Sequence, residues 1–159
     1  MIWFAPLLSL LLIALDQWTK HWARAHLQPV GTRPVWEGFF ALTYVENRGA
    51  AFGLMQGGRW FFVVLTVVVL AGMVYYYIRL PQTGKNWLVR VPMIFVFAGA
   101  AGNLIDRAWL GYVTDMFQFT FINFPVFNVA DVCLVIGTAA LAAVLLFIIR
   151  DPDGNITAQ

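Results

Sequence analysis

Four long apolar segments constrain the fold of this chain more than any other feature of its sequence. They cover residues 3–24, 59–79, 87–110 and 128–149. Apolar runs of about 20 residues are typical of helices that cross a bilayer. The chain is 61% hydrophobic and 11% charged, whereas soluble domains carry about 25% charged residues. The pattern predicts one all-α integral-membrane domain over residues 1–159, built as a bundle of four transmembrane helices.

Polar and charged residues gather at one end of this expected bundle. In an up-down-up-down arrangement, the ends of the first and third spans lie beside the starts of the second and fourth. The residues at these positions are Asp16 and Lys20, Asn47 and Arg48, Asn103, Asp106 and Arg107, and Asn128 and Asp131. Ionisable groups within a membrane protein are costly and commonly functional. We therefore expect a functional site where these residues converge.

Two connecting segments have the composition of β-strands. Residues 35–45 are rich in aromatic and β-branched side chains, and residues 113–121 alternate between apolar and polar. A period of two indicates a strand, and it places Asp115 on the same face as Phe117 and Phe119. We expect the loops 25–58 and 111–127 to be extracytoplasmic and to pair as a small β-sheet on the bilayer surface.

Asp115 and Asp131 are the candidate catalytic pair. Two carboxylates held close in a partly dehydrated site share one proton, so that one acts as a general base on water and the other as an acid. Each also has a structural explanation. Asp131 follows Asn128 by three residues, as in a capped helix N-terminus, and Asp115 could be an ordinary loop carboxylate.

Other residues are expected to pack or to pair rather than to take part in chemistry. Asp16 and Lys20, and likewise Asn103 and Arg107, are spaced i,i+4 and share a helix face, so the first pair predicts a salt bridge. Small residues around Gly99 and Gly102 favour close helix contact. We expect no metal site, because His21 and His26 lack partners at ligand spacing. The single cysteine, Cys133, is expected to be a small buried apolar residue.

The distribution of basic residues bears on orientation. Arg79, Lys85 and Arg90 flank the short connection between the second and third spans, which favours a cytoplasmic location for that connection and for both termini. The basic residues on the other side are then assigned to a site or to lipid phosphates. The first span lacks the basic start of a signal peptide, and we expect it to be retained. A net charge of +2 gives no indication of nucleic-acid binding.

Five short motifs resemble, in order, those of bacterial lipoprotein signal peptidase (signal peptidase II). They are Asp16-Gln17-x-x-Lys20, Asn47-x-Gly49-Ala50-Ala51-Phe52, Gly102-Asn103-x-x-Asp106-Arg107, Val113-x-Asp115 and Phe127-Asn128-x-Ala130-Asp131. The resemblance covers about residues 10–140. Each motif is weak alone, but five in register across four spans are highly specific.

The resemblance implies a monomeric aspartyl endopeptidase of the bacterial inner membrane, with its site near the periplasmic face. Such an enzyme removes signal peptides from prolipoproteins by cleaving before a diacylglyceryl-modified cysteine, without a cofactor. Its partners are that lipid-modified substrate and membrane lipids. The resemblance assigns catalysis to Asp115 and Asp131 and makes the loop 25–58 a cradle and flap. The residues expected to bind substrate or support the site are Asp16, Lys20, Asn47, Gly49, Asn103, Asp106, Arg107, Asn128 and Ala130.

Two other classes of function are a small transporter or ion-conducting protein and a non-enzymatic scaffold. A small transporter or ion-conducting protein could relay protons through Asp16, Asp106 and Asp131. However, the second and fourth spans carry no charge at their middle, and no repeated halves are visible. A non-enzymatic membrane scaffold would not need two aspartates at a dehydrated site. The sequence therefore favours the peptidase.

Overall fold

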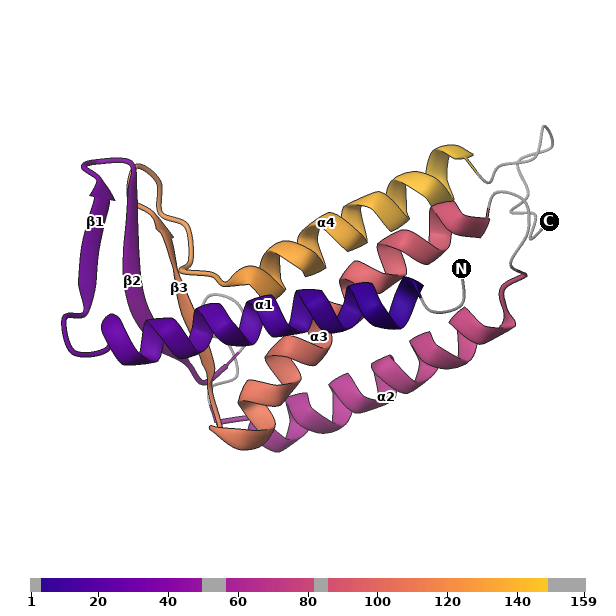
Figure 1. Ribbon diagram of the computed structural model, residues 1–159, viewed down its shortest axis with the longest axis horizontal. Helices are drawn as coiled ribbons and strands as arrows, with labels where there is room; N and C mark the ends of the chain where they lie inside the picture. Colours follow the sequence, from indigo (N-terminus) through magenta and orange to yellow (C-terminus); the bar gives the residue numbers. More distant parts are fainter. Residues whose placement is uncertain (1–3, 50–56, 82–85, 149–159) are drawn as a thin grey trace.

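The computed structural model describes residues 4–49, 57–81 and 86–148. Four long helices and three strands account for most of them (Figure 1). The helices are α1 (Phe4–His26), α2 (Arg59–Arg79), α3 (Trp87–Trp109) and α4 (Val129–Ala143), the last continued by the short π-helix η3 (Val144–Ile148). The strands are β1 (Thr32–Trp36), β2 (Phe40–Asn47) and β3 (Val113–Phe119).

Helix α3 is the centre of the helical bundle. It packs against α1, α2 and α4, whereas none of the residues of α2 is buried. Within the described ranges, three stretches are long and apolar enough to cross a membrane: Arg59–Arg79, Trp87–Trp109 and Val129–Leu146. Helix α1 is as long as α3, but its second half carries Asp16, Lys20 and Arg24.

Small residues allow the helices to approach closely. A Cβ atom added at Gly99 would overlap the carbonyl oxygen of Ala130, and one added at Gly137 would lie 2.8 Å from the backbone nitrogen of Val96. Both contacts join α3 to α4. At Gly102 an added Cβ would lie 2.5 Å from a carboxylate oxygen of Asp16. The close approach expected around Gly99 and Gly102 is confirmed.

The three strands form one antiparallel sheet in the order β1-β2-β3. The predicted pairing of the two loop segments is confirmed, because Val45 of β2 lies opposite Asp115 of β3. The strand-like stretch 35–45 is not continuous, however. A turn separates β1 from β2, and Gly38 adopts φ of 71° there, a conformation that glycine reaches without steric penalty.

The sheet is fixed to the end of α1 by an apolar cluster. Ala23 of α1 and Leu27, which follows the helix, are buried against Met116 of β3, with Trp22 and Leu42 packed around them. Figure 1 shows the sheet at the end of the bundle where α1 and α3 finish and where α2 and α4 begin. This arrangement brings the sheet, the ends of α1 and α3 and the start of α4 to one place.

Candidate active site

Asp115 lies on β3 and is almost completely buried, with 2% of its surface exposed. Two side-chain amides donate to its carboxylate. Asn128 Nδ2 lies 2.6 Å from Oδ1, and Asn47 Nδ2 lies 3.1 Å from Oδ2. Both carboxylate oxygens therefore have a protein donor, and the side chain is held in one orientation.

Asp131 lies in the first turn of α4 and forms a capping box with Asn128. The Asp131 backbone N–H donates to Asn128 Oδ1 at 2.9 Å, and the Asn128 N–H donates to Asp131 Oδ2 at 3.1 Å. The other carboxylate oxygen of Asp131 accepts from Asn103 Nδ2 at 2.8 Å. The capping explanation for Asp131 is thus correct, and it is compatible with a role in a site because the same side chain also faces Asn103.

Asn128 connects the two carboxylates through its side-chain and backbone N–H groups, which donate to Asp115 and to Asp131 respectively. Its Nδ2 donates to Asp115, and its Oδ1 accepts from the Asp131 backbone. Burial, followed by the nearby charge of Asp131, raises the pKa of Asp115 to about 7. At neutral pH the pair can therefore hold one proton, as a general acid and a general base together require.

A buried ammonium group lies beneath this pair. Lys20 is completely buried, and its Nζ lies 2.9 Å from Asp16 Oδ2 and 3.6 Å from Asp106 Oδ2. The predicted Asp16–Lys20 salt bridge is confirmed. Asp16 also accepts the backbone N–H of Ala130 at 2.9 Å, and Asp106 accepts that of Thr114 at 2.9 Å. These bonds tie α1 and α3 to the starts of α4 and β3.

Lys20 also determines how the amide of Asn103 is oriented. Its ammonium donates to Asn103 Oδ1 at 2.8 Å. Because an ammonium can only donate, the amide oxygen must face Lys20, and the Nδ2 group is left to donate to Asp131. Asn128 Nδ2 approaches the same oxygen at 3.2 Å. The buried charge is thereby linked to both aspartates through neutral amides.

The loop after β2 reaches the same place. The Gly49 N–H donates to Asn47 Oδ1 at 3.1 Å, and the Gly49 carbonyl accepts from Arg107 Nη2 at 3.1 Å. The Arg107 guanidinium lies 5.2 Å from the ring centroid of Phe62. Residues 50–56 of the loop 25–58, which include the Ala50-Ala51-Phe52 motif, lie outside the described part of the chain.

The residues expected at the site thus belong to one connected cluster, except Arg48, which is exposed and pairs with Glu46 at 2.8 Å. Gln17, Arg24 and Thr114 also belong to this cluster, although the sequence pattern did not indicate them as site residues. Gln17 Nε2 lies within 3.3 Å of Asp16, the Gly102 carbonyl and Asp106, and Arg24 donates to Thr114 Oγ1 at 2.9 Å. Lys20 and Arg24 are spaced i,i+4, so helical spacing from Lys20 was the signal that could have identified Arg24.

No group of three or more histidine, cysteine, aspartate or glutamate side chains is placed to hold a metal ion within the residues described above. His26 stacks on Trp22 with ring centroids 5.3 Å apart. Cys133 is buried in α4. The chemistry available in the cluster is that of carboxylates, amides and the surrounding cations.

The fold and the site together define a class: a membrane protein with two carboxylates linked by amides at one end of a helical bundle. Residues 8–147 match the family model for Signal peptidase (SPase) II. The chain belongs to the signal peptidase II family, which is a family of peptidases.

Curated relatives and solved structures agree with this assignment. The chain is 44% identical over 140 residues to a lipoprotein signal peptidase of Streptococcus thermophilus, covering 88% of this chain and 90% of the relative. It is 48% identical over 136 residues to one from Caldanaerobacter subterraneus, covering 85% and 90% respectively. A solved bacterial membrane enzyme that is 33% identical superposes with a TM-score of 0.83, over 92% of this chain and 89% of that one.

Proposed function

We propose that this chain is an aspartic endopeptidase that removes signal peptides from prolipoproteins, cleaving before the diacylglyceryl-modified cysteine. The observation that carries the aspartic assignment is the linkage of Asp115 to Asp131 through Asn128. Membership in a peptidase family supplies the reaction class. The substrate follows from the names of the relatives, which are lipoprotein signal peptidases.

The two carboxylates have different environments, which suggests their roles. Asp115 is buried, and a pKa raised to about 7 leaves about half of it protonated at neutral pH, so it is the proposed acid. Asp131 is only half-buried and is the proposed base. Asp131 takes a proton from water as the water oxygen bonds to the scissile carbonyl carbon. Asp115 donates its proton to the carbonyl oxygen, and the leaving nitrogen is protonated from the pair as the C–N bond breaks.

The remaining cluster would position this pair. Asn128 and Asn47 hold Asp115, and Asn103 holds Asp131. Arg107 fixes the carbonyl of Gly49 at the start of the flap segment. Asp16, Lys20, Asp106 and Ala130 would lock the helices around the pair. No cofactor is needed in this mechanism, because the two carboxylates supply both the acid and the base.

The proposed topology has four spans, with α1 as the first. The charges in its second half are compatible with a span, because Lys20 and Asp16 are buried against each other and away from lipid. We place the protein in the bacterial inner membrane as a monomer, with both termini cytoplasmic. The sheet and the carboxylates then lie at the outer face. There water reaches the peptide bond while the acyl chains of the substrate stay in the bilayer.

The test is cleavage by the purified protein in detergent of two forms of one prolipoprotein. One form carries the diacylglyceryl group on its cysteine, and the other is unmodified. We expect cleavage immediately before the modified cysteine and little or none of the unmodified form. Failure of a folded protein to cleave the modified form contradicts the proposed function, and equal cleavage of both forms contradicts the proposed recognition of lipid.

A further inference from the structure

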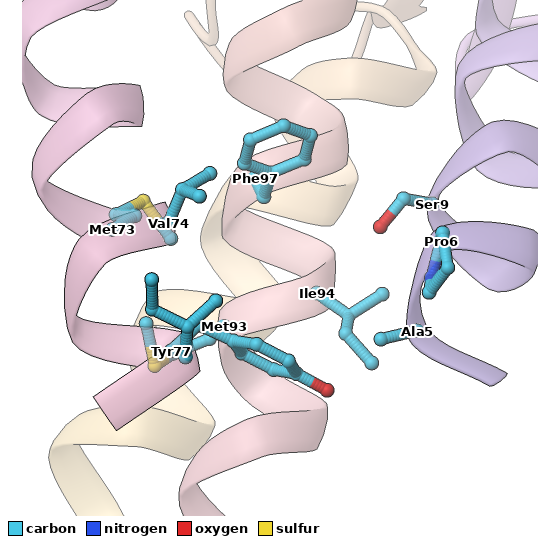
Figure 2. A pocket seen from close by; sticks show the side chains of 10 residues that line it. Ala5, Pro6, Ser9, Met73, Val74, Tyr77, Met93, Ile94 and Phe97 are labelled. Atoms are coloured by element: carbon cyan, nitrogen blue, oxygen red, sulfur yellow. The ribbon is translucent and has the colours of Figure 1, made fainter. Parts of the chain in front are cut away.

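A second feature of the bundle lies at the end opposite the carboxylates. It is an apolar pocket of about 300 Å³ between the start of α1, the second half of α2 and the first half of α3. Figure 2 shows α3 behind the pocket, with α2 on one side and Ala5, Pro6 and Ser9 of α1 on the other. The ring of Tyr77 and the side chains of Ile94 and Phe97 also line it.

The pocket lies where α1 and α2 each pack on α3 and where the lining residues of α1 are small. Ala5, Pro6 and Ser9 are the α1 residues that line it. A space among membrane helices that the protein leaves unfilled loses dispersion contacts on every side. In a bilayer the molecules available to fill an apolar space of this size are lipid acyl chains.

Arg90 lies just beyond this pocket on the same face of α3. It precedes Ile94 by four residues and Phe97 by seven, a spacing that places the three side chains in one row. Its guanidinium lies 4.5 Å from the ring centroid of Tyr77 and donates to the carbonyl oxygen of Leu80. The pocket therefore has a cation at one end.

One donor of that cation is unsatisfied. Nε of Arg90 is buried and has no hydrogen-bond partner among the residues that the structure describes. A buried donor without an acceptor is destabilising, and such groups in native structures commonly have a bound partner. A phosphate suits this position, because arginine binds phosphate oxygens through its planar set of N–H groups.

We propose that this pocket and Arg90 form a binding site for one anionic phospholipid. An acyl chain fills the space between α1 and α2, and a phosphate oxygen accepts from the guanidinium of the half-buried Arg90. The charge at this end of the bundle favours an anionic lipid. Arg79 and Arg90 are both there, and the described segments that build this end, 4–12, 73–81, 86–97 and 138–148, contain no acidic residue.

The bound lipid would join α1 to α2. Helix α2 otherwise has its packing on α3 and no buried residue. A ligand that binds only the folded state stabilises it in proportion to its concentration. The site is separate from the carboxylate pair, so it does not depend on the catalytic assignment. With the proposed topology it faces the cytoplasmic leaflet, where anionic lipids are concentrated.

The experiment is a lipid titration of the detergent-purified protein, followed by native mass spectrometry. The probes are dioleoyl phosphatidylglycerol and dioleoyl phosphatidylcholine, which share acyl chains and differ in net charge. We expect the parent protein to bind phosphatidylglycerol about tenfold more tightly, because the choline ammonium of phosphatidylcholine offsets the phosphate charge that attracts Arg90. Equal affinity for the two lipids overturns the proposal.

Three variants locate the site. Arg90→Gln should abolish the preference for phosphatidylglycerol. Arg79→Gln is the matched control, because it removes the same charge at the same end of the bundle and should leave the preference intact. Ser9→Phe fills the pocket without altering Arg90, and it should weaken the binding of both lipids. An equal loss of preference in the two arginine variants overturns the proposal. Unchanged affinities in Ser9→Phe also overturn it, and that test holds even if Arg90→Gln fails to fold.

Discussion

Replacing Asp115 with asparagine is expected to stabilise the folded protein at pH 8 while removing its activity. The reason is that the pKa of Asp115 is raised from 3.8 to about 7 in the folded protein, first by burial and then by the charge of Asp131. The folded state therefore binds this proton more tightly than the unfolded state does. Stability from this group falls as the pH rises from about 4 to about 7, and is constant above that.

The magnitude follows from the shift. A rise of about 3 pH units corresponds to about 4 kcal/mol of destabilisation at pH 8, at about 1.4 kcal/mol per unit. Asparagine does not ionise, so the variant avoids this destabilisation. It has one acceptor oxygen instead of two, so it loses the hydrogen bond from Asn47 or the one from Asn128, which costs about 1–3 kcal/mol. We expect the variant to be more stable than the parent by about 1–3 kcal/mol at pH 8 and to lose that advantage at pH 5.

The measurement is thermal unfolding of the two proteins in the same detergent from pH 5 to pH 8. The difference in melting temperature between the two proteins isolates the titration of Asp115, because the two proteins share all other titrating groups. Melting temperatures that run parallel across this range would refute the reasoning, since they would mean that Asp115 has an ordinary pKa in the folded protein. A parent that gains stability relative to the variant as the pH rises would refute the sign of the shift.

Three other outcomes are expected. The peptidase kcat/KM should fall tenfold per pH unit above about pH 7, where Asp115 loses its proton; a rate that rises there would contradict its role as the acid. In Asp131→Asn the fall in stability with pH should still begin at about pH 4 but end at lower pH in unfolding experiments, because a charge that raises the folded-state pKa of Asp115 is gone; an unchanged profile would contradict the coupling. Gly99→Ala should lower stability by about 1–3 kcal/mol through overlap with α4, whereas Gly72→Ala, with nothing within 4 Å of its added Cβ, should be neutral; equal effects in denaturation would contradict the packing.

The part of this structure that the sequence could predict depends on local spacing. The salt bridge of Asp16 with Lys20 follows from an i,i+4 separation, and the capping box follows from Asn128 and Asp131 three residues apart. The alternating pattern of β3 likewise predicted a strand. In each case the interaction is decided within one or two turns of chain, where periodicity is informative.

The long-range contacts could not be read in the same way. Helices that are apolar on most faces leave their rotation about the bundle undetermined. The sequence therefore did not reveal that Asn103 faces both Lys20 and Asp131, or that Gln17 bridges two acids. The turn at Gly38 was not predicted because both sides of it are rich in aromatic and β-branched residues, so the whole segment has the composition of one strand. A glycine with positive φ interrupts that segment without changing its average character.

The most direct test of the central claim is the rate of cleavage of a diacylglyceryl-modified prolipoprotein by Asp115→Asn and Asp131→Asn. Glu37→Gln is the matched control, because it neutralises an exposed carboxylate in the turn between β1 and β2. The account predicts that each aspartate variant is folded and inactive and that the control keeps the parental rate. Activity above a few per cent of the parental rate in either folded aspartate variant would contradict the assignment of Asp115 and Asp131 as the catalytic pair.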